Sequence, residues 1–289
     1  MSAVMSTVAR GGVVITGAST GIGHACALHL DRIGFRVFAG VRRDEDAERL
    51  RQDGSERLQP VKIDVTDRDA IRRAAAEVET ALGADRLAGL VNNAGIAVSG
   101  PIEFLPIEEV RKQLEVNFIG QVAVTQAFLP RLRRDRGRIV NIGSVGGEVA
   151  LPFLSPYAAS KHAIEGFTDS LRREVEPLGV HVAVVRPGAI QSSIWERGNV
   201  AADEIIAALP PEAFEIYGDK LRVARAAAEQ RARDANPAQA VADVVEHALT
   251  AERPKTRYVV GRTGKAMVAL ERWLPDRAFD RLVARAMRG

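Results

Sequence analysis

A tyrosine and a lysine stand four residues apart, at Tyr157 and Lys161, near the start of a helical pattern. Residues i and i+4 share one face of a helix, so the phenol and the ammonium project together. A free tyrosine has a pKa of about 10, and a nearby cation favours the tyrosinate and lowers that pKa. Such a pair could move a proton to or from an alcohol oxygen. A Tyr–Lys pair on a helix is by itself usually structural, so the neighbouring motifs decide whether it is interpreted as catalytic.

A serine precedes this pair in the glycine-rich sequence IGSVGG of residues 142–147, directly after a strand pattern. The glycines give space and backbone freedom to a ligand, and the hydroxyl of Ser144 could bind a substrate oxygen. The alternative is a serine that only forms a turn. Nucleophilic Ser–His chemistry is less favoured, because no G-x-S-x-G elbow follows a strand and the five histidines have no evident triad context.

A second glycine-rich loop, TGASTGIG of residues 16–23, joins the first strand pattern to the first helical pattern. Gly17 permits a tight turn, Gly21 lets the backbone approach a pyrophosphate, and Gly23 allows close packing of the helix on the strand. The backbone N–H groups and the helix dipole then face the phosphates. The spacing is G-x-x-x-G-x-G and not the commoner G-x-G-x-x-G. The prediction of a dinucleotide site therefore depends on the position of the loop between the first strand and the first helix. The expected cofactor contacts here are Gly17, Ser19, Thr20, Gly21, Ile22 and Gly23.

The elements that must position these residues alternate along the chain, with short β-branched runs followed by longer amphipathic segments. The runs do not alternate apolar with polar residues, as expected for parallel strands covered on both faces. This order predicts an α/β fold, a Rossmann-type doubly wound parallel sheet of about seven strands. The expected strands are Gly12–Thr16, Arg36–Ala39, Leu58–Asp64, Gly89–Asn92, Arg138–Ile142, His181–Arg186 and Tyr258–Val260, and the expected helices are 21–33, 44–52, 67–82, 107–133, 155–177 and 237–249.

A single domain is expected over residues 1–264, with the dinucleotide-binding and catalytic residues together in it. The segment at about 189–236 interrupts the alternation of strand and helix patterns. It follows the carboxyl end of a strand, and open α/β sheets bind ligands at that edge. It contains the isolated aromatic residues Trp195, Phe214 and Tyr217. A long insertion often serves as an active-site lid, so a helical substrate lid is expected; the alternative is a surface helical hairpin.

The composition is that of a globular protein without a disulfide framework. The single cysteine, Cys26, falls on a helix expected to be buried, where a small inert hydrophobe is the better interpretation. The formal net charge is +3, so a nucleic-acid partner is not expected. No stretch of about 18 apolar residues indicates a membrane span, and a cytoplasmic protein is expected. Residues 265–289 form an amphipathic tail that is expected to pack on the protein, contact with a membrane surface being the alternative.

The loop TGASTGIG resembles the cofactor motif of the short-chain dehydrogenase/reductase family, and further family motifs follow in order over about residues 10–262. The matching positions are Asp64-Val65, Asn92-Asn93-Ala94-Gly95, Asn117, Ser144, Tyr157, Lys161 and Pro187-Gly188. The resemblance implies an NAD(P)-dependent oxidoreductase that interconverts a primary or secondary alcohol and an aldehyde or ketone. It also implies a catalytic set formed by Asn117, Ser144, Tyr157 and Lys161.

The family pattern further implies how the adenosine end of the cofactor is held. Asp64 and Val65 would hold the adenine ring. Asn93, Ala94 and Gly95 would line the adenosine and ribose side of the cleft. The alternative for these three residues is an ordinary turn, because asparagine and glycine tolerate positive φ.

At the other end of the cofactor, the same resemblance places Pro187-Gly188 near the nicotinamide and Lys161 on its ribose. The substrate carbonyl would bond to Tyr157 and Ser144, hydride would pass from the nicotinamide to carbon, and Tyr157 would supply the proton. Asn117 would distort its helix and hold a water that extends the proton relay from the lysine. Oxidation would follow the same path backwards.

The end of the second strand, VFAGVRR at residues 37–43, bears on the choice of nicotinamide cofactor. An acidic residue there would hydrogen-bond the ribose 2′-hydroxyl of NAD, whereas an arginine accommodates the 2′-phosphate of NADP. Arg42 and Arg43 precede the first acid and can make charge-assisted bonds to a phosphate, which predicts a preference for NADP(H) over NAD(H). The alternative is that both arginines are solvated and pair with Asp44 or Glu45.

The stretches VFAGVRR and PYAASKHAIEGFTDSLRREVEPLGV resemble the steroid and retinol dehydrogenase branch of the family, which implies a bulky hydrophobic substrate. The helices around 108–130 and 155–177 often form the oligomer interface in this family, so a homodimer or homotetramer is expected. Two other functions stay open. One is a nucleotide-sugar epimerase or dehydratase with a similar Tyr–Lys pair, and the other is a redox sensor that binds a dinucleotide without turning it over.

Overall fold

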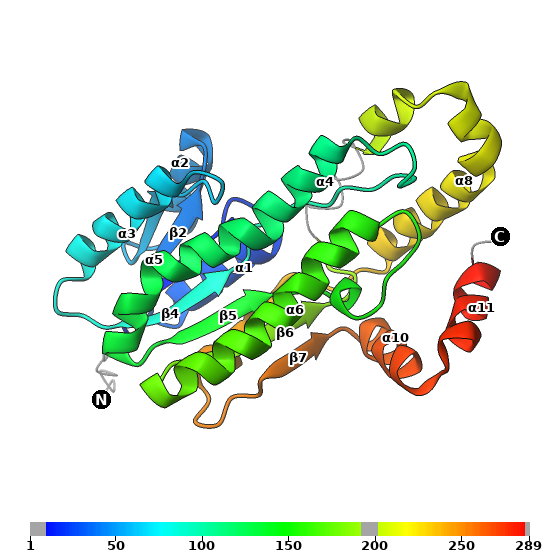
Figure 1. Cartoon of the computed structure of the whole chain (residues 1–289). Helices are drawn as coiled ribbons and strands as arrows, with labels where there is room; N and C mark the ends of the chain where they lie inside the picture. Colours follow the sequence, from blue (N-terminus) through cyan, green and yellow to red (C-terminus); the bar gives the residue numbers. More distant parts are fainter. Residues whose placement is uncertain (1–9, 192–201, 287–289) are drawn as a thin grey trace, which may run out of the picture.

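Seven parallel strands form one sheet in the computed structural model, which describes residues 10–191 and 202–286 (Figure 1). The strand order is β3-β2-β1-β4-β5-β6-β7, so the predicted doubly wound sheet is confirmed. Each expected strand is present, with boundaries that shift by a few residues. The strands are β1 (Gly12–Ile15), β2 (Arg36–Val41), β3 (Leu58–Lys62), β4 (Leu87–Asn92), β5 (Arg138–Ile142), β6 (His181–Pro187) and β7 (Arg257–Val260).

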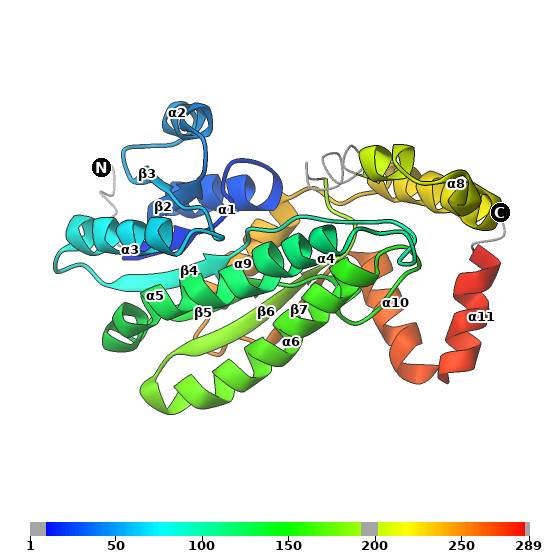
Figure 2. The same ribbon diagram turned by 45° about the horizontal axis from the view of Figure 1, so that its top comes forward.

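Helices cover both faces of this sheet (Figures 1 and 2). Apolar residues of α1, α2 and α9 pack on one face, and those of α3, α5 and α6 pack on the other. The helix expected over 107–133 is divided by a π-helical turn at Glu115–Ile119. The helices are α1 (Gly21–Arg32), α2 (Asp44–Asp53), α3 (Arg68–Leu82), α4 (Ile107–Leu114), α5 (Gly120–Asp135), α6 (Ser155–Val175) and α9 (Gln239–Thr250).

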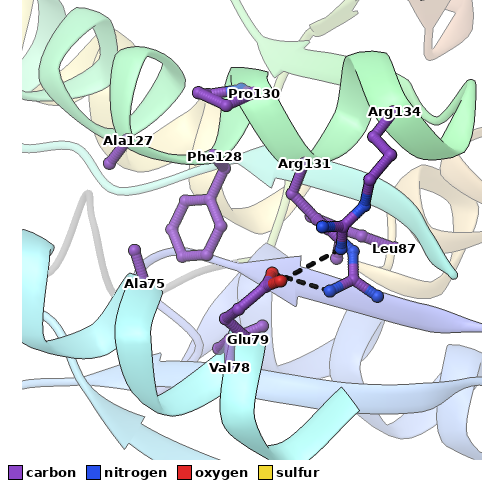
Figure 3. Close-up of a pocket in the computed structure, with 9 residues that line it drawn as sticks. All are labelled: Ala75, Val78, Glu79, Leu87, Ala127, Phe128, Pro130, Arg131 and Arg134. Atoms are coloured by element: carbon purple, nitrogen blue, oxygen red, sulfur yellow. Dashed lines mark hydrogen bonds and ion pairs between the residues drawn. The ribbon is translucent and has the colours of Figure 1, made fainter. Parts of the chain in front are cut away.

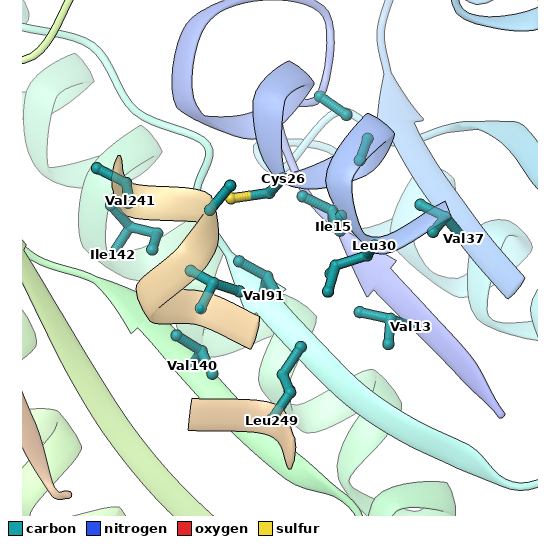
Figure 4. Packing of buried hydrophobic residues seen from close by; sticks show 14 of the residues in the cluster. Val13, Ile15, Cys26, Leu30, Val37, Val91, Val140, Ile142, Val241 and Leu249 are labelled. Carbon is teal, nitrogen blue, oxygen red and sulfur yellow. The ribbon is translucent and has the colours of Figure 1, made fainter. Parts of the chain in front are cut away.

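Successive side chains of each strand enter opposite cores, because side chains alternate across a sheet. Val13 and Ile15 of β1 pack in the core beneath α1 and α9, whereas Val14 packs in the core on the other face. Cys26 of α1 is fully buried in the first core (Figure 4). Burial raises the pKa of its thiol to about 12, so the residue is a small uncharged core side chain, as predicted.

The strand order reverses between β1 and β4, because the chain winds outward from β1 to β3 and then returns to the other side of β1. At such a reversal the carboxyl ends of the strands open a crevice in which α/β proteins bind ligands. The glycine-rich loop of residues 16–23 leaves β1 at this crevice, and the segment Asn93–Gly95 leaves β4 beside it. The two loops that carry the predicted cofactor contacts are therefore neighbours.

The predicted insertion at 189–236 contains one long helix, α8 (Pro211–Arg233). Tyr217 of α8 donates a hydrogen bond to Glu103 at 2.8 Å, and its ring packs edge-to-face on Phe104 and Phe153. Of the other two aromatic residues singled out in this segment, Phe214 is 45% exposed and Trp195 lies outside the described residues. Tyr217 thus connects α8 to the loops after β4 and β5.

Two further helices, α10 (Arg262–Trp273) and α11 (Asp276–Ala286), form an angled pair beyond β7 (Figure 2). Phe279 of α11 is buried in a small cluster with Val145 and Val149, so this part of the tail packs on the loop after β5, as expected. Trp273, the last residue of α10, is 84% exposed. Within residues 10–191 and 202–286, no helix combines the length and the apolar composition of a membrane span.

Candidate active site

The end of β4 holds the glycine-rich loop of residues 16–23 in place. The side-chain amide of Asn93 donates hydrogen bonds to the backbone oxygens of Thr16 and Gly17, at 2.9 and 3.0 Å. In return, the hydroxyl oxygen of Thr16 accepts from the backbone N–H groups of Asn93 and Ala94, both at 3.0 Å. The amide of Asn93 therefore braces the loop, a structural task that the family pattern did not specify. Thr16, which shares this task, was not among the predicted site residues.

Glycines in this loop occupy positions that a side chain would disturb. Gly17 and Gly21 have positive φ values of 65° and 58°, which glycine adopts without steric cost. A Cβ atom on Gly23 would lie 2.3 Å from the backbone oxygen of Gly17 and 2.4 Å from Nδ2 of Asn93. The start of α1 thus presents a bare backbone, and such a cradle fits the pyrophosphate of a dinucleotide.

Tyr157 and Ser144 meet in one cavity at the carboxyl ends of β5 and β6. Their side chains share a hydrogen bond, and both residues line a cavity of about 290 Å³. Ser144 Oγ also accepts a hydrogen bond from the backbone N–H of Gly146 at 3.0 Å, which fixes the start of the loop. The structure therefore brings together the two hydroxyl groups that the sequence assigned to the substrate oxygen.

The surroundings of Tyr157 raise the pKa of its phenol, whereas the sequence analysis predicted a lowered value. Burial disfavours the tyrosinate, and the hydrogen bond with Ser144 offsets only part of this effect. The Lys161 ammonium lies over the ring, 5.9 Å from its centre, and donates a hydrogen bond to the Ile142 oxygen at 2.9 Å. The cation does not offset the burial, so the phenol stays protonated at neutral pH.

Replacing Lys161 with methionine is expected to change how stability depends on pH. Burial lowers the pKa of Lys161 to about 8, against the opposing effect of Glu165, whereas an unfolded lysine titrates near 10.4. Between about pH 8 and about pH 10 the unfolded wild type binds more protons than the folded protein, so its free energy of unfolding rises with pH. The gain amounts to about 3 kcal/mol at most, and the variant lacks it. Denaturant unfolding of both proteins across this range measures the difference, and equal pH slopes would contradict the prediction.

Asn117 lies in the π-helical turn between α4 and α5, so the predicted helix distortion at this residue is confirmed. Its Oδ1 accepts from the N–H of Ile96 at 2.8 Å, and its Nδ2 donates to the Ile96 oxygen at 3.0 Å and to Ser160 Oγ at 3.1 Å. Ser160 donates to the backbone oxygen of Tyr157 at 2.7 Å. Asn117 thus connects the segment after β4 to the helix of the tyrosine, and its part in a water relay stays a prediction.

Gln113, one helical turn before Asn117, has a similar role that the sequence analysis missed. It is fully buried, accepts from the N–H of Val98 at 2.6 Å and donates to the Ile96 oxygen at 2.9 Å. Both side chains therefore secure the chain after β4. A glutamine in a helix carries no local signal for such a contact, because its partners lie 15 and 17 residues away.

A buried ion cluster, also missed, lies behind the catalytic candidates. Arg186 of β6 donates to both carboxylate oxygens of Glu165 on α6, at 2.8 and 2.7 Å, and pairs with Glu148 as well. Glu148 follows the loop that carries Ser144, and Glu165 lies one turn after Lys161. The guanidinium therefore joins the serine loop to the helix of Tyr157 and Lys161.

The arginines expected at the 2′-phosphate lie at the end of β2, and they differ in their surroundings. Arg43 pairs with Asp46 through two hydrogen bonds, at 3.0 and 3.2 Å, and not with Asp44 or Glu45 as in the alternative considered above. The Asp46 carboxylate raises the pKa of Arg43. Within the described ranges, the side chain of Arg42 makes no hydrogen bond or ion pair, so Arg42 is the arginine that could bind a phosphate without breaking a contact.

At the end of β3, the Oδ1 atom of Asp64 accepts hydrogen bonds from the backbone N–H and the hydroxyl of Thr66, at 2.9 and 2.7 Å. Val65 is buried, and its backbone oxygen would lie 2.7 Å from a Cβ atom on Gly120. These contacts shape the turn after β3. They place the two residues expected at the adenine on the β2–β3 side of the crevice, away from the cavity of Tyr157.

The walls of the cavity at Tyr157 are mostly apolar and come from distant parts of the chain. Pro187-Gly188 lines it, so the residues expected at the nicotinamide share it with Ser144 and Tyr157. Phe153, Leu221 of α8 and Met267 of α10 lie on other walls. From α8, the described lining residues are Leu221, Ala224, Ala228 and Ala232 together with the polar residues Arg225, Gln230 and Arg231, and they include neither Phe214 nor Tyr217. The insertion thus lines the cavity, although Phe214 and Tyr217 take no part in the lining.

A second hollow, of about 270 Å³, lies between α3 and α5 (Figure 3). Glu79 of α3 pairs there with Arg131 and Arg134 of α5, at 2.7 and 3.0 Å. Arg131 also bonds to Asp135 and to the backbone oxygens of Gly83 and Asp85. These charges hold the two helices to the sheet, and the hollow includes no residue of the candidate site.

The comparisons agree with this geometry. Residues 12–202 match the family model described as short chain dehydrogenase. The 17-beta-hydroxysteroid dehydrogenase type 6 of Bos taurus is 37% identical over 279 residues, which cover 95% of this chain and 88% of that protein. Retinol dehydrogenase 5 of Mus musculus is 37% identical over 274 residues, covering 93% and 86%. A short chain dehydrogenase from Burkholderia cenocepacia, solved in complex with NADP, has a TM-score of 0.72 and 27% identity, covering 96% of this chain and 97% of that one. The chain therefore belongs to the short chain dehydrogenase family of oxidoreductases.

Proposed function

We propose that this chain prefers NADP(H), interconverts a bulky hydrophobic alcohol and its ketone or aldehyde, and uses Tyr157 as the general acid and base. The observation that carries the proposal is the shared cavity, in which the hydroxyls of Tyr157 and Ser144 meet next to Pro187-Gly188. Its apolar walls suit a hydrophobic substrate. The names of the steroid and retinol dehydrogenases among the relatives support the same substrate class.

The residues present fit a nicotinamide dinucleotide, which when bound would supply or take up the hydride. The loop of residues 16–23 would hold its phosphates and Lys161 its nicotinamide ribose. Ser144 and Tyr157 orient the carbonyl oxygen of the substrate through hydrogen bonds. Because its pKa is raised, the phenol of Tyr157 is protonated and can give its proton to that oxygen as the alcohol forms. In the oxidation the reverse step starts from the tyrosinate of Tyr157, which takes the proton from the alcohol as the carbonyl forms.

The proposal is tested by mixing the purified protein with a panel of hydrophobic alcohols and ketones, with NADP(H) or NAD(H), and following the absorbance of the reduced nicotinamide. Turnover of hydrophobic members, with a higher kcat/KM for NADP(H), is the expected result. Stoichiometric binding of a cofactor without turnover across the panel would support the redox sensor instead.

Substituting Arg42 with aspartate is expected to reverse the cofactor preference. Hydrogen bonds to charged groups contribute about 1.5–3 kcal/mol, so kcat/KM for NADP(H) should fall at least about tenfold. The value for NAD(H) should be kept or rise, because an acid at this position can accept from the 2′-hydroxyl. The matched control is Arg51→Asp on α2. Arg51 lies at the surface, and its Nη1 atom is 3.4 Å from Oε2 of Glu48. An unchanged ratio of the two efficiencies in Arg42→Asp would remove the argument for NADP(H).

A further inference from the structure

We propose that Arg231, in the last turn of α8, binds an anionic group of the substrate inside the active-site cavity. The substrates would then be amphipathic, with an apolar body that carries a carboxylate or a similar oxyanion. This inference rests on the proposed function, because it concerns the same cavity. It adds a recognition element that neither the relatives' names nor the motifs specify.

Arg231 differs in charge from most of the residues that line the cavity. The wall that α8 provides also contains Leu221, Ala224 and Ala228, together with Arg225 and Gln230, and Val149 lies on another wall. Arg231 is exposed to solvent, so its charge keeps contact with water while it lies beside these apolar side chains.

The other charged residues that line the cavity have partners of their own. Arg225 is neutralised by Asp203, at 2.9 Å, and contacts Glu229 at 3.2 Å. Asp234 accepts a hydrogen bond from Gln230 at 2.7 Å. The side chain of Arg231, in contrast, has no hydrogen bond or ion pair with any residue in the ranges 10–191 and 202–286.

The pKa of the Arg231 guanidinium also reflects the lack of a carboxylate partner among the described residues. Burial lowers its pKa, and no carboxylate opposes the effect, whereas carboxylate partners raise the pKa of the buried Arg186. The residue as a whole keeps its exposure to solvent, as expected for a side chain that projects into an open cavity. The guanidinium therefore offers a planar set of donors to a ligand, and this geometry matches a carboxylate or another oxyanion.

The end of α8 that carries Arg231 is joined to the chain beside the residues expected at the nicotinamide. The backbone N–H of Asn236, just after α8, bonds to the Ala189 oxygen at 2.9 Å, and the N–H of Gln191 bonds to the Asn236 oxygen at 2.9 Å. These bonds tie the end of α8 to the chain just after Pro187-Gly188. None of the described residues of the glycine-rich loop lines this cavity, so an anion at Arg231 belongs to the substrate and not to the cofactor pyrophosphate.

Octanoate and octanamide are suitable probes, because they share a chain and differ in the charge of the head group. Their dissociation constants are measured by calorimetry on the full chain saturated with NADP, for the wild type, Arg231→Gln and Arg231→Lys. Arg233→Gln is the matched control, since Arg233 lies on the same turn and bonds to Gln230. The wild type is expected to bind octanoate at least about tenfold more tightly than octanamide. Arg231→Gln should lose this difference, Arg231→Lys should keep part of it, and Arg233→Gln should keep all of it.

Equal affinities for the two probes in the wild type, or an undiminished difference in Arg231→Gln, would overturn the inference. A loss of NADP affinity in Arg231→Gln with unchanged octanoate binding would also overturn it, because the anion would then be a cofactor phosphate. The measurement needs no turnover, so it is separate from the proposed chemistry. Tyr157→Phe should retain the preference for octanoate even if its kinetics contradict the role proposed for the tyrosine.

Discussion

Tyr157→Phe is expected to lower kcat by about 100- to 10,000-fold, the usual contribution of a positioned general acid or base. The substitution removes only the hydroxyl, which shares a hydrogen bond with Ser144 in the cavity. The ring, which the Lys161 ammonium faces, should keep its place in the lining of the cavity. The affinity for NADP(H) should change little, because the bare backbone at the start of α1 is expected to hold the phosphates.

Tyr258→Phe provides the matched control for this experiment. Tyr258 is also buried, and its hydroxyl bonds to His247 at 3.0 Å and to the backbone N–H of Lys255 at 2.8 Å, away from the cavity. Losing this hydroxyl should cost about 1 kcal/mol of stability and leave kcat unchanged. Steady-state kinetics and denaturant unfolding of both variants make the comparison. A near wild-type kcat in Tyr157→Phe with cofactor bound would refute the acid–base role.

The raised pKa of Tyr157 shows why local sequence was a poor guide to its electrostatics. The i, i+4 spacing correctly placed Tyr157 and Lys161 on one helix face. It could not show that the ammonium lies over the ring and bonds to the Ile142 oxygen. That oxygen comes from β5, 19 residues earlier in the chain. A pKa depends on burial and on every neighbour in space, so only the fold determines its direction.

The fold itself was largely predictable, because its signals are local. The strands are short apolar runs, since both faces of a parallel sheet are buried, and the glycines of residues 16–23 mark the turn from the first strand into the first helix. The predicted helix at 107–133 was correct in extent, but the π-helical turn at Glu115–Ile119 inside it was found through the resemblance and not from helical periodicity. Asn117 in that turn is held by Ile96 and Ser160.

The residues that the sequence analysis missed share a dependence on distant contacts. Gln113 binds the chain after β4, and Arg186 reaches Glu148 and Glu165, which lie 38 and 21 residues away. Arg231 gains its significance only from the cavity that it lines. Each is an ordinary polar residue in its own segment, so its role becomes visible only when the strands and helices are assembled.

Arg186→Leu is expected to reduce the free energy of unfolding by about 3–5 kcal/mol, the typical cost of removing one partner from a buried ion cluster. The arginine is 9% exposed, and its loss would leave the carboxylates of Glu148 and Glu165 without their main cation. Arg257, 3.8 Å from Glu165, could compensate only in part. Because Glu148 follows the loop of Ser144, that loop should lose its fixed position relative to α6, and kcat should fall by roughly tenfold to a hundredfold.

The control for this variant is Arg111→Leu on α4, where the arginine and Glu108 are both exposed and lie 3.4 Å apart. Such surface pairs contribute about 0–1 kcal/mol, so its stability and kcat should stay close to those of the wild type. Denaturant unfolding and steady-state kinetics measure both effects, and Arg186→Lys should recover part of each, because it restores the charge without the planar guanidinium. If Arg186→Leu destabilised the protein but kept full kcat in its folded fraction, the cluster would support the fold without positioning Ser144. An unfolding free energy like that of Arg111→Leu would mean that the cluster contributes no more than a surface ion pair.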